Sequence, residues 1–241
     1  ARELYERIIE LNPEHASADH MRAALSGEAR NHSPNGYVRE VFDEFAGHYE
    51  ASLTGNLGYD LPSELLTIYL HLLPGGRPRL LDLGCGTGLV GEQFCSLCQA
   101  MTGVDISRKM LDVAHEKKLY DSLHVSEIIE FLRTNSETDY DLIVCADVLP
   151  YLGDLEELFN RVSSIMAAQG HFMFSVEHVS SDADLPVLQQ SGRFAHSRSY
   201  VSDRAARAGW NIISQTLLNL RKEREGWIQG SIYVMSLAPV K

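Results

Sequence analysis

A glycine-rich turn between an apolar strand and a helix constrains this chain more than any other feature. The segment "RLLDLGC", residues 79–85, reads as a buried strand and runs into Gly84, Gly86 and Gly88 before the helical segment "GLVGEQFCSLC". Glycine lets the backbone turn sharply and lets a ligand approach closely at the start of the next helix. The turn therefore predicts an open α/β sheet that binds a nucleotide-type ligand.

The rest of the chain supports that fold class. Strand-like segments "AMTGVDI", "DSLHVSE", "YDLIVCADV" and "GHFMFSVE" alternate with helical segments after residue 85. Such alternation is typical of a parallel, doubly wound sheet. The final segments "NIISQTLLNLRKE" and "GSIYVMSLAPV" are joined by "REGWIQG" without a helix, which predicts an antiparallel hairpin. We expect an α/β fold with a seven-stranded, mostly parallel sheet.

Composition narrows the partners and the compartment. The 241 residues carry a net charge of −12, which disfavours binding to nucleic acid, and no apolar run is long enough to span a membrane. Four cysteines are too few for a disulfide scaffold, and the Cys95-x-x-Cys98 pair lacks a second pair that would complete a metal site. We expect a soluble cytoplasmic protein without a bound metal.

The first 36 residues differ from the rest. Two short amphipathic helices over residues 1–27, separated by "LNP" and stopped by Gly27, resemble the last part of a tetratricopeptide repeat. A helical extension that packs on the main domain is an equal alternative. We expect residues 1–36 to form this extension and linker, which is a possible contact for a protein partner, and residues 37–241 to form one domain. Since the chain begins with Ala1, we also expect it to be part of a longer protein.

Two ligand classes fit the glycine turn. The "GTGLVG" segment, residues 86–91, matches a dinucleotide-binding pattern, whereas Asp82 just before the turn would oppose a pyrophosphate and suit an ammonium group. Asp105 follows Gly84 at the separation expected for an acid that binds ribose hydroxyls, which both ligand classes carry. A cationic ligand with an adenosine part is favoured over NAD.

These motifs together resemble a known family. The acid-x-Gly-x-Gly-x-Gly loop, "GVDIS" and "YDLIVCADVLPYL" are similar to those of class I S-adenosylmethionine-dependent methyltransferases. The segments "GVDISRKMLDVAHEKKLYDSL" and "SGRFAHSRSY" further resemble bacterial predicted methyltransferases with tetratricopeptide repeats in front. The resemblance implies a Rossmann-like methyltransferase fold and S-adenosylmethionine as cofactor.

The resemblance also implies roles for individual residues near the cofactor. Asp82 and the Gly84 backbone would hold the methionine part, Gly86 and Gly88 would leave room, and Cys85 lies within the same loop. Further cofactor contacts would come from Tyr49, Asp105 (ribose), Ile106 and Met110 (adenine), Glu127 or Ser126 (adenine amino group), and Ala146, Asp147 and Val148 (methionine side). Asp147 could instead be a cap or turn residue, and Tyr49 and Tyr59 could be core packing.

The acceptor side is predicted less sharply. A sulfonium methyl is already activated, so the enzyme mainly aligns donor and acceptor, and a general base helps with a hydroxyl or amine. Glu177, His178 and His196 are the catalytic candidates, while His171 should lie at the opposite edge of the sheet. Tyr59, Tyr151, Arg193 and His196 are the candidate acceptor contacts, and the Arg and His hint at a small anionic acceptor, although a surface loop without a ligand is an alternative.

Three functions stay open at this point. The leading one is methyl transfer to an unidentified small molecule. An NAD-dependent oxidoreductase is supported by the glycine spacing and Asp105 alone. A non-catalytic binding module with a vestigial cofactor site would use the N-terminal helices to dock a partner.

Overall fold

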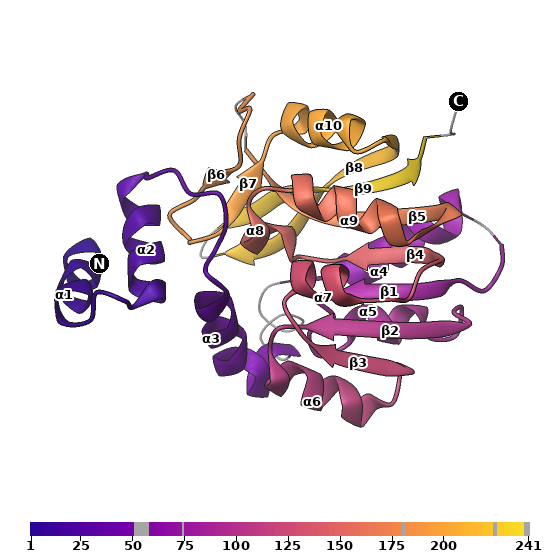
Figure 1. Cartoon of the computed structure of the whole chain (residues 1–241), viewed down its shortest axis with the longest axis horizontal. Coiled ribbons are helices and arrows are strands. Elements are labelled where there is room, and N and C mark those ends of the chain that lie inside the picture. Colours follow the sequence, from indigo (N-terminus) through magenta and orange to yellow (C-terminus); the bar gives the residue numbers. More distant parts are fainter. Residues whose placement is uncertain (51–57, 74, 180–181, 224–225, 239–241) are drawn as a thin grey trace.

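One mixed sheet forms the centre of the molecule (Figure 1). The computed structural model describes residues 1–50, 58–73, 75–179, 182–223 and 226–238. Five parallel strands run in the order β3-β2-β1-β4-β5. They are β1 (Arg79–Leu83), β2 (Ala100–Asp105), β3 (Ser122–Val125), β4 (Tyr140–Cys145) and β5 (Met166–His178). The predicted parallel, doubly wound sheet is confirmed.

The antiparallel hairpin at the end of the chain is also confirmed. β8 (Trp210–Glu223) pairs with β9 (Gly226–Leu237), and β9 pairs antiparallel with β5. The connecting residues 224–225 and the last predicted strand residues, 239–240, lie outside the described residues.

Two short strands extend the seven that the sequence predicts. β6 (Val187–Leu188) and β7 (Phe194–His196) form a small antiparallel pair, and β7 runs parallel to the end of β5 beside Glu177 and His178. The polar sequence of residues 178–200 conceals them because strands this short carry no clear alternation. Within the described residues the sheet therefore has nine strands.

Helices cover both faces of the sheet, and the strands bury alternate residues on each. Leu80 packs among residues of α4 (Leu61–Leu72) and α5 (Leu89–Phe94), whereas its neighbour Leu81 belongs to the cluster on the other face. That second cluster includes side chains from α7 (Ile128–Thr134), α9 (Glu156–Ile165) and α10 (Arg198–Arg207). Strands buried on both faces are expected when βα units wind in both directions.

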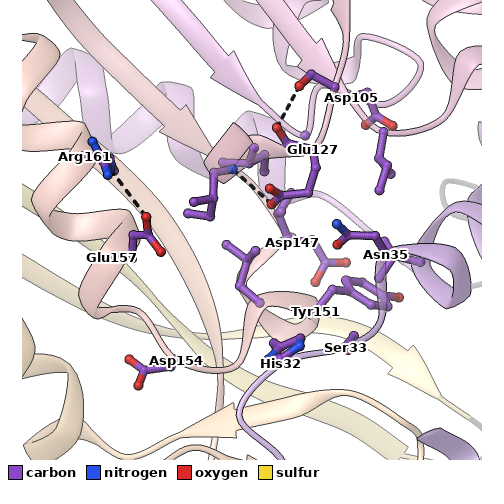
Figure 2. A pocket seen from close by; sticks show the side chains of 18 of the residues that line it. His32, Ser33, Asn35, Asp105, Glu127, Asp147, Tyr151, Asp154, Glu157 and Arg161 are labelled. Carbon is purple, nitrogen blue, oxygen red and sulfur yellow. Dashed lines mark hydrogen bonds and ion pairs between the residues drawn. The ribbon is translucent and has the colours of Figure 1, made fainter. Parts of the chain in front are cut away.

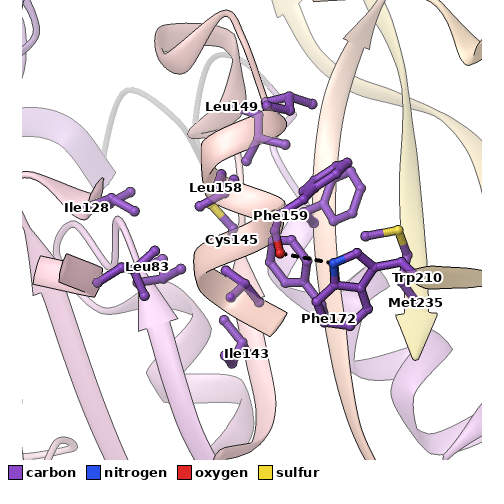
Figure 3. Close-up of a cluster of buried hydrophobic side chains, with 14 of the residues drawn as sticks. Leu83, Ile128, Ile143, Cys145, Leu149, Leu158, Phe159, Phe172, Trp210 and Met235 are labelled. Atoms are coloured by element: carbon purple, nitrogen blue, oxygen red, sulfur yellow. Dashed lines mark hydrogen bonds between the residues drawn. The ribbon is translucent and has the colours of Figure 1, made fainter. Parts of the chain in front are cut away.

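The α9 side of this core is shown in Figure 3. Phe159 of α9 lies against Phe172 of β5, with ring centroids 6.1 Å apart, and Trp210 closes the group from β8. The buried indole Nε1 of Trp210 donates to the Phe159 carbonyl at 3.1 Å. The hairpin is thus locked onto the parallel sheet by both apolar contact and a satisfied polar group.

The N-terminal region begins with the two predicted helices. α1 (Arg2–Leu11) and α2 (Ala16–Ser26) pack on each other, and Gly27 ends α2 with φ +69°. α3 (Asn35–Phe45) and the short helix η1 (Ala46–His48) follow. In Figure 1, α3 lies between the α1–α2 pair and the carboxyl ends of the parallel strands.

Two further helices follow the carboxyl ends of parallel strands. α6 (Arg108–Lys117) follows β2, and α8 (Leu149–Leu152) follows β4. No helix among the described residues is long and apolar enough to cross a membrane.

Candidate active site

The glycine turn forms a tight loop at the carboxyl end of β1. Gly84, Gly86 and Gly88 have φ values of +75°, +53° and +92°, which favour glycine. A Cβ on Gly84 would collide with Val148, which follows β4. The Gly84 amide donates to the Val104 carbonyl at 2.7 Å, so the loop is held between β2 and the end of β4.

Asp105 is fixed against this loop from the end of β2. Its carboxylate accepts from the amides of Gly86 and Ser107 at 2.9 and 2.8 Å. The residue is 8% exposed, and burial raises the pKa of its carboxyl to about 6. Ser107 in turn caps α6 by accepting from the Met110 amide. The carboxylate is therefore preorganised at the rim of the cavity described next.

A cavity of about 860 Å³ opens beside the loop and Asp105. It extends from the glycine loop, past α8, to α9, and Figure 2 shows Asp105, Asp147 and Tyr151 around it. The volume lies within the range of small-molecule sites, which is roughly 300–1,000 Å³. Its place at the carboxyl ends of β1, β2 and β4 is where open α/β sheets bind ligands.

Most predicted cofactor residues line this cavity. They are Tyr49, Gly84, Gly86, Asp105, Ile106, Glu127, Ala146, Asp147 and Val148. Ser126, the alternative to Glu127, lines it as well. Cys85 and Tyr59 border a separate void of about 20 Å³ on the other side of the loop, together with Tyr49 and Ala146.

Three predicted cofactor residues, Asp82, Gly88 and Met110, line neither this cavity nor the smaller void. Met110 is fully buried in the first turn of α6 and does not line the cavity, although it follows Ile106 by one helical turn. Gly88 faces the Tyr120 ring, which would lie 3.2 Å from an added Cβ. Met110 and Gly88 thus pack inside the fold in this structure.

Glu127 lines the cavity but is occupied as a helix cap. Its carboxylate accepts from the amides of Ile129 and Glu130 at 3.0 and 2.9 Å, at the start of α7. Both oxygens thus stabilise the N-terminus of α7.

Asp82 lies fully buried beneath the glycine loop. One carboxylate oxygen, Oδ2, accepts from the Tyr120 hydroxyl at 2.6 Å, while the other has no hydrogen-bond partner among the described residues. Burial raises the pKa of this carboxyl to about 7. An unpartnered buried carboxylate oxygen fits a ligand that brings its own donor, such as an ammonium group.

The charge cluster, which we define as Asp147, Glu177, Arg193, Arg221 and Glu223, borders the cavity at Asp147. Arg221 pairs with both Asp147 and Glu177, and Arg193 pairs with Glu177 at 2.7 Å and with Glu223. Asp147 also has φ +58°, and its amide donates to the Ser175 hydroxyl at 2.8 Å. The cluster holds the backbone after β4 in a conformation that few non-glycine residues adopt.

The predicted catalytic candidates lie outside the cavity lining. Glu177 is 4% exposed and is held by two guanidinium groups. His178 Nε2 contacts the Ser231 hydroxyl at 2.7 Å, and burial lowers the pKa of this imidazole. His196 is fully buried, donates from Nε2 to the Gly153 carbonyl at 2.6 Å, and has a pKa lowered by burial to about 4. These three side chains are engaged inside the fold.

Of the predicted acceptor contacts, only some line the cavity. Tyr151 lines the cavity from α8, with its ring 5.1 Å from that of Phe42. Arg193 does not line it, because its guanidinium is taken up by Glu177 and Glu223. His171, expected at the opposite edge of the sheet, lies within β5 beside Leu142 and Ser236 and does not line the cavity.

The crossing segment, residues 28–34 between α2 and α3, adds a wall that the sequence did not indicate. Asn31, His32 and Ser33 line the cavity, and Figure 2 shows His32 and Ser33 near Tyr151. The Asp154 amide donates to the Asn31 carbonyl at 2.8 Å. The turn formers in this segment indicated a linker, and its polar side chains were the one signal of a further role.

Arg221 and Tyr120 were also missed. In the sequence, Arg221, Lys222 and Arg224 alternate with glutamates, a pattern typical of a solvated helix or strand end, but Arg221 is 7% exposed. Within the described residues no group of three or more His, Cys, Asp or Glu side chains could hold a metal ion.

Comparison with known proteins agrees with this geometry. The profile of the family described as "Methyltransferase domain" matches residues 81–172. Nodulation protein S of Rhizobium tropici is 31% identical over 111 residues, 44% of this chain and 46% of that protein. The ubiquinone biosynthesis O-methyltransferase of Ralstonia nicotianae is 28% identical over 115 residues, 46% of this chain and 48% of that protein. The chain thus spans about half the length of these two curated relatives.

Longer matches come from a yeast protein and from solved structures. The probable S-adenosylmethionine-dependent methyltransferase CRG1 of Saccharomyces cerevisiae is 25% identical over 198 residues, 77% of this chain and 67% of that protein. The N-methyltransferase NodS of Bradyrhizobium japonicum, solved with S-adenosyl-L-homocysteine, has a TM-score of 0.66 at 18% identity and covers 84% of this chain and 98% of its own. The likeness to NodS shows a shared fold. Residues 81–172, which match the methyltransferase domain family, thus lie within a longer stretch of chain that has the NodS fold.

Proposed function

We propose that this protein uses S-adenosylmethionine to methylate a small-molecule acceptor. The observation that carries the proposal is the pairing of Asp105 with the glycine loop at the rim of the cavity of about 860 Å³. The domain match over residues 81–172 supports it and gives no support to the NAD-dependent oxidoreductase.

The residues present fit this cofactor. Asp105 would accept from the ribose hydroxyls, Ile106 would pack on the adenine, and Asp82 would pair with the ammonium group through the oxygen that lacks a donor. When bound, the cofactor supplies an activated methyl group. Gly84 and Val148 would shape the methionine side of the wall, and Tyr49, between both voids, would exclude water.

We place the acceptor in the part of the cavity between α8 and the crossing segment. Among the described lining residues, His32 is the one histidine, and it replaces Glu177, His178 and His196 as our candidate general base. Since Arg193 is engaged in ion pairs, and six carboxylates line the cavity against two guanidinium groups, those of Arg133 and Arg161, we favour a neutral or cationic acceptor, such as an amine or hydroxyl, over an anionic one.

The N-terminal helices are proposed as an accessory region. We propose that residues 37–241 form the methyltransferase domain and that residues 1–36 form an extension related to a tetratricopeptide repeat. Leu4 and Leu11 of α1 are 70% and 74% exposed, which supports a protein contact there.

The four free thiols fit a cytoplasmic location, and the net charge of −12 disfavours a nucleic-acid acceptor.

Calorimetric titration with S-adenosylhomocysteine, with NADH in parallel, tests the proposal. We expect micromolar binding of the first ligand alone, and at least about 10-fold weaker binding by Asp105→Ala, because charged hydrogen bonds contribute about 1.5–3 kcal/mol. Asp112→Ala, an exposed acid on α6 paired with Arg108, is the control. Binding of NADH alone would favour the oxidoreductase, and tight binding without turnover over a broad acceptor panel would favour the binding module.

A further inference from the structure

The Tyr120 hydroxyl reaches beneath the glycine loop through a slot of glycines. Tyr120 lies in the connection between α6 and β3, and its Oη donates to Asp82 Oδ2 at 2.6 Å. A Cβ on Gly91 of α5 would come 2.6 Å from Oη, and one on Gly103 of β2 would come 3.1 Å from Cδ1. With Gly88 at 3.2 Å from Cε2, glycines on three segments make room for one ring.

This slot explains a glycine that the sequence left ambiguous. Gly91 ends the "GTGLVG" segment that matches a dinucleotide-binding pattern. In the structure its missing side chain makes space for the Tyr120 hydroxyl. The glycine at position 91 is therefore explained by the room that the Tyr120–Asp82 hydrogen bond needs. A bound pyrophosphate is not needed to explain it.

Asp82 is left with one oxygen for a ligand. The residue is fully buried, Oδ2 is taken by Tyr120, and Oδ1 accepts no hydrogen bond from the described residues. Without Tyr120 the carboxylate would have two unsatisfied oxygens and no contact to set its rotation. The hydroxyl thus decides which oxygen is free.

Resting on the proposed function, we propose that Tyr120 is a positioning residue for the cofactor, whose hydroxyl holds one oxygen of Asp82 so that the other accepts from the ammonium group of the amino-acid portion. Tyr120 acts through Asp82 and is not assigned a contact with the ligand.

The surroundings of Asp82 add a pH signature. The titratable groups that interact with it are Asp105 on β2, Tyr59, and the thiols of Cys85, Cys98 and Cys145, besides Tyr120 itself. Burial raises the pKa of the Asp82 carboxyl, Asp105 raises it further, and the Tyr120 bond lowers it. Since the ionised form pairs with an ammonium group, loss of the hydroxyl should move the onset of binding to higher pH.

The test compares two ligands on the full chain. S-adenosylhomocysteine carries the amino-acid portion, and 5′-methylthioadenosine keeps the adenosine and thioether without it. For Tyr120→Phe we expect about 10-fold weaker binding of S-adenosylhomocysteine, unchanged binding of 5′-methylthioadenosine, and a pH midpoint displaced upward. Gly91→Ala, which pushes the hydroxyl aside while keeping the tyrosine, should give the same selective loss.

Tyr140→Phe is the matched control. Its Oη donates to Glu137 Oε2 at 3.0 Å at the start of β4, so its removal should leave both affinities unchanged. Equal weakening of both ligands by Tyr120→Phe, or no weakening of either, would overturn the positioning role. Failure of the wild-type protein to bind S-adenosylhomocysteine would instead overturn the proposed function.

Discussion

Two buried carboxylates, on strands of the sheet that β4 separates, have opposite surroundings. Glu177, at the end of β5, is held by Arg193 and Arg221 within the charge cluster. Asp82, on β1 beneath the glycine loop, has a tyrosine on one oxygen and no described partner on the other. A satisfied carboxylate supports the fold, whereas an unsatisfied one costs stability that a ligand can restore. The partners of a buried carboxylate therefore distinguish a structural residue from a binding residue more clearly than its residue type does.

The largest effect is expected from breaking the satisfied region. Arg221→Met leaves Asp147 and Glu177 buried without their shared partner, so the free energy of unfolding should fall by about 3–5 kcal/mol. Urea unfolding measures the change. Arg108→Met, which breaks an exposed pair with Asp112 on α6, should stay within about 0.5 kcal/mol of wild type. A similar small loss in both variants would contradict a structural role for the cluster.

The glycine loop gives the next largest effect. Gly84→Ala combines an unfavourable positive φ with a collision against Val148, and should lower both stability and affinity for S-adenosylhomocysteine. Gly27→Ala has the same sign of φ, with nothing within 4 Å of the added Cβ, so it should cost only about 1–2 kcal/mol in strain. Thermal unfolding of the two variants separates strain from collision; equal losses would argue against the close approach at Gly84.

The unsatisfied carboxylate should give a pH dependence of its own. With a pKa near 7 in the folded protein and near 3.8 when unfolded, Asp82 holds its proton longer in the folded state. Its contribution to stability is therefore present below pH 4 and lost as the pH rises to 7, by at most about 1.4 kcal/mol per pH unit. Asp82→Asn lacks this term, so unfolding at pH 5 and pH 8 should show the variant gaining on wild type with rising pH. A pH-independent difference would contradict the raised pKa.

The smallest effect concerns Glu127. Glu127→Ala removes the cap of α7 and should lower the free energy of unfolding by about 1 kcal/mol. Because we assign Glu127 to capping α7 and not to the cofactor, affinity for S-adenosylhomocysteine should change little. A large loss of affinity, measured by calorimetry, would instead favour contact with the adenine amino group.

The same contrast explains what the sequence could predict. The alternation of strands and helices, the hairpin, and the place of Asp105 beside the glycine loop follow from local patterns, because each is set by residues of one segment or of two consecutive ones. The place of Asp105 at the ligand-binding edge of the sheet was therefore predictable from the sequence.

Contacts between distant segments were not predictable in this way. Arg221 meets Asp147 across 74 positions of sequence, and Tyr120 meets Asp82 across 38. Arg193 and His196 were expected to face an acceptor, yet a cation and an imidazole have the same local signature whether a carboxylate of the fold or a ligand pairs with them. Whether such a side chain is free for a ligand depends on a pairing residue that lies elsewhere in the chain.

The two walls of the site come from different stretches of the chain and can therefore change independently in evolution. Asn31, His32 and Ser33 are consecutive in the chain, while the loop and Asp105 that face them across the cavity belong to β1 and β2. Exchange of this one short stretch between related proteins would change the wall toward the acceptor and leave the loop and Asp105 intact. A new acceptor preference could therefore arise through recombination or short insertions near the N-terminus, provided that residues 151 and 154 still match the backbone of the incoming segment.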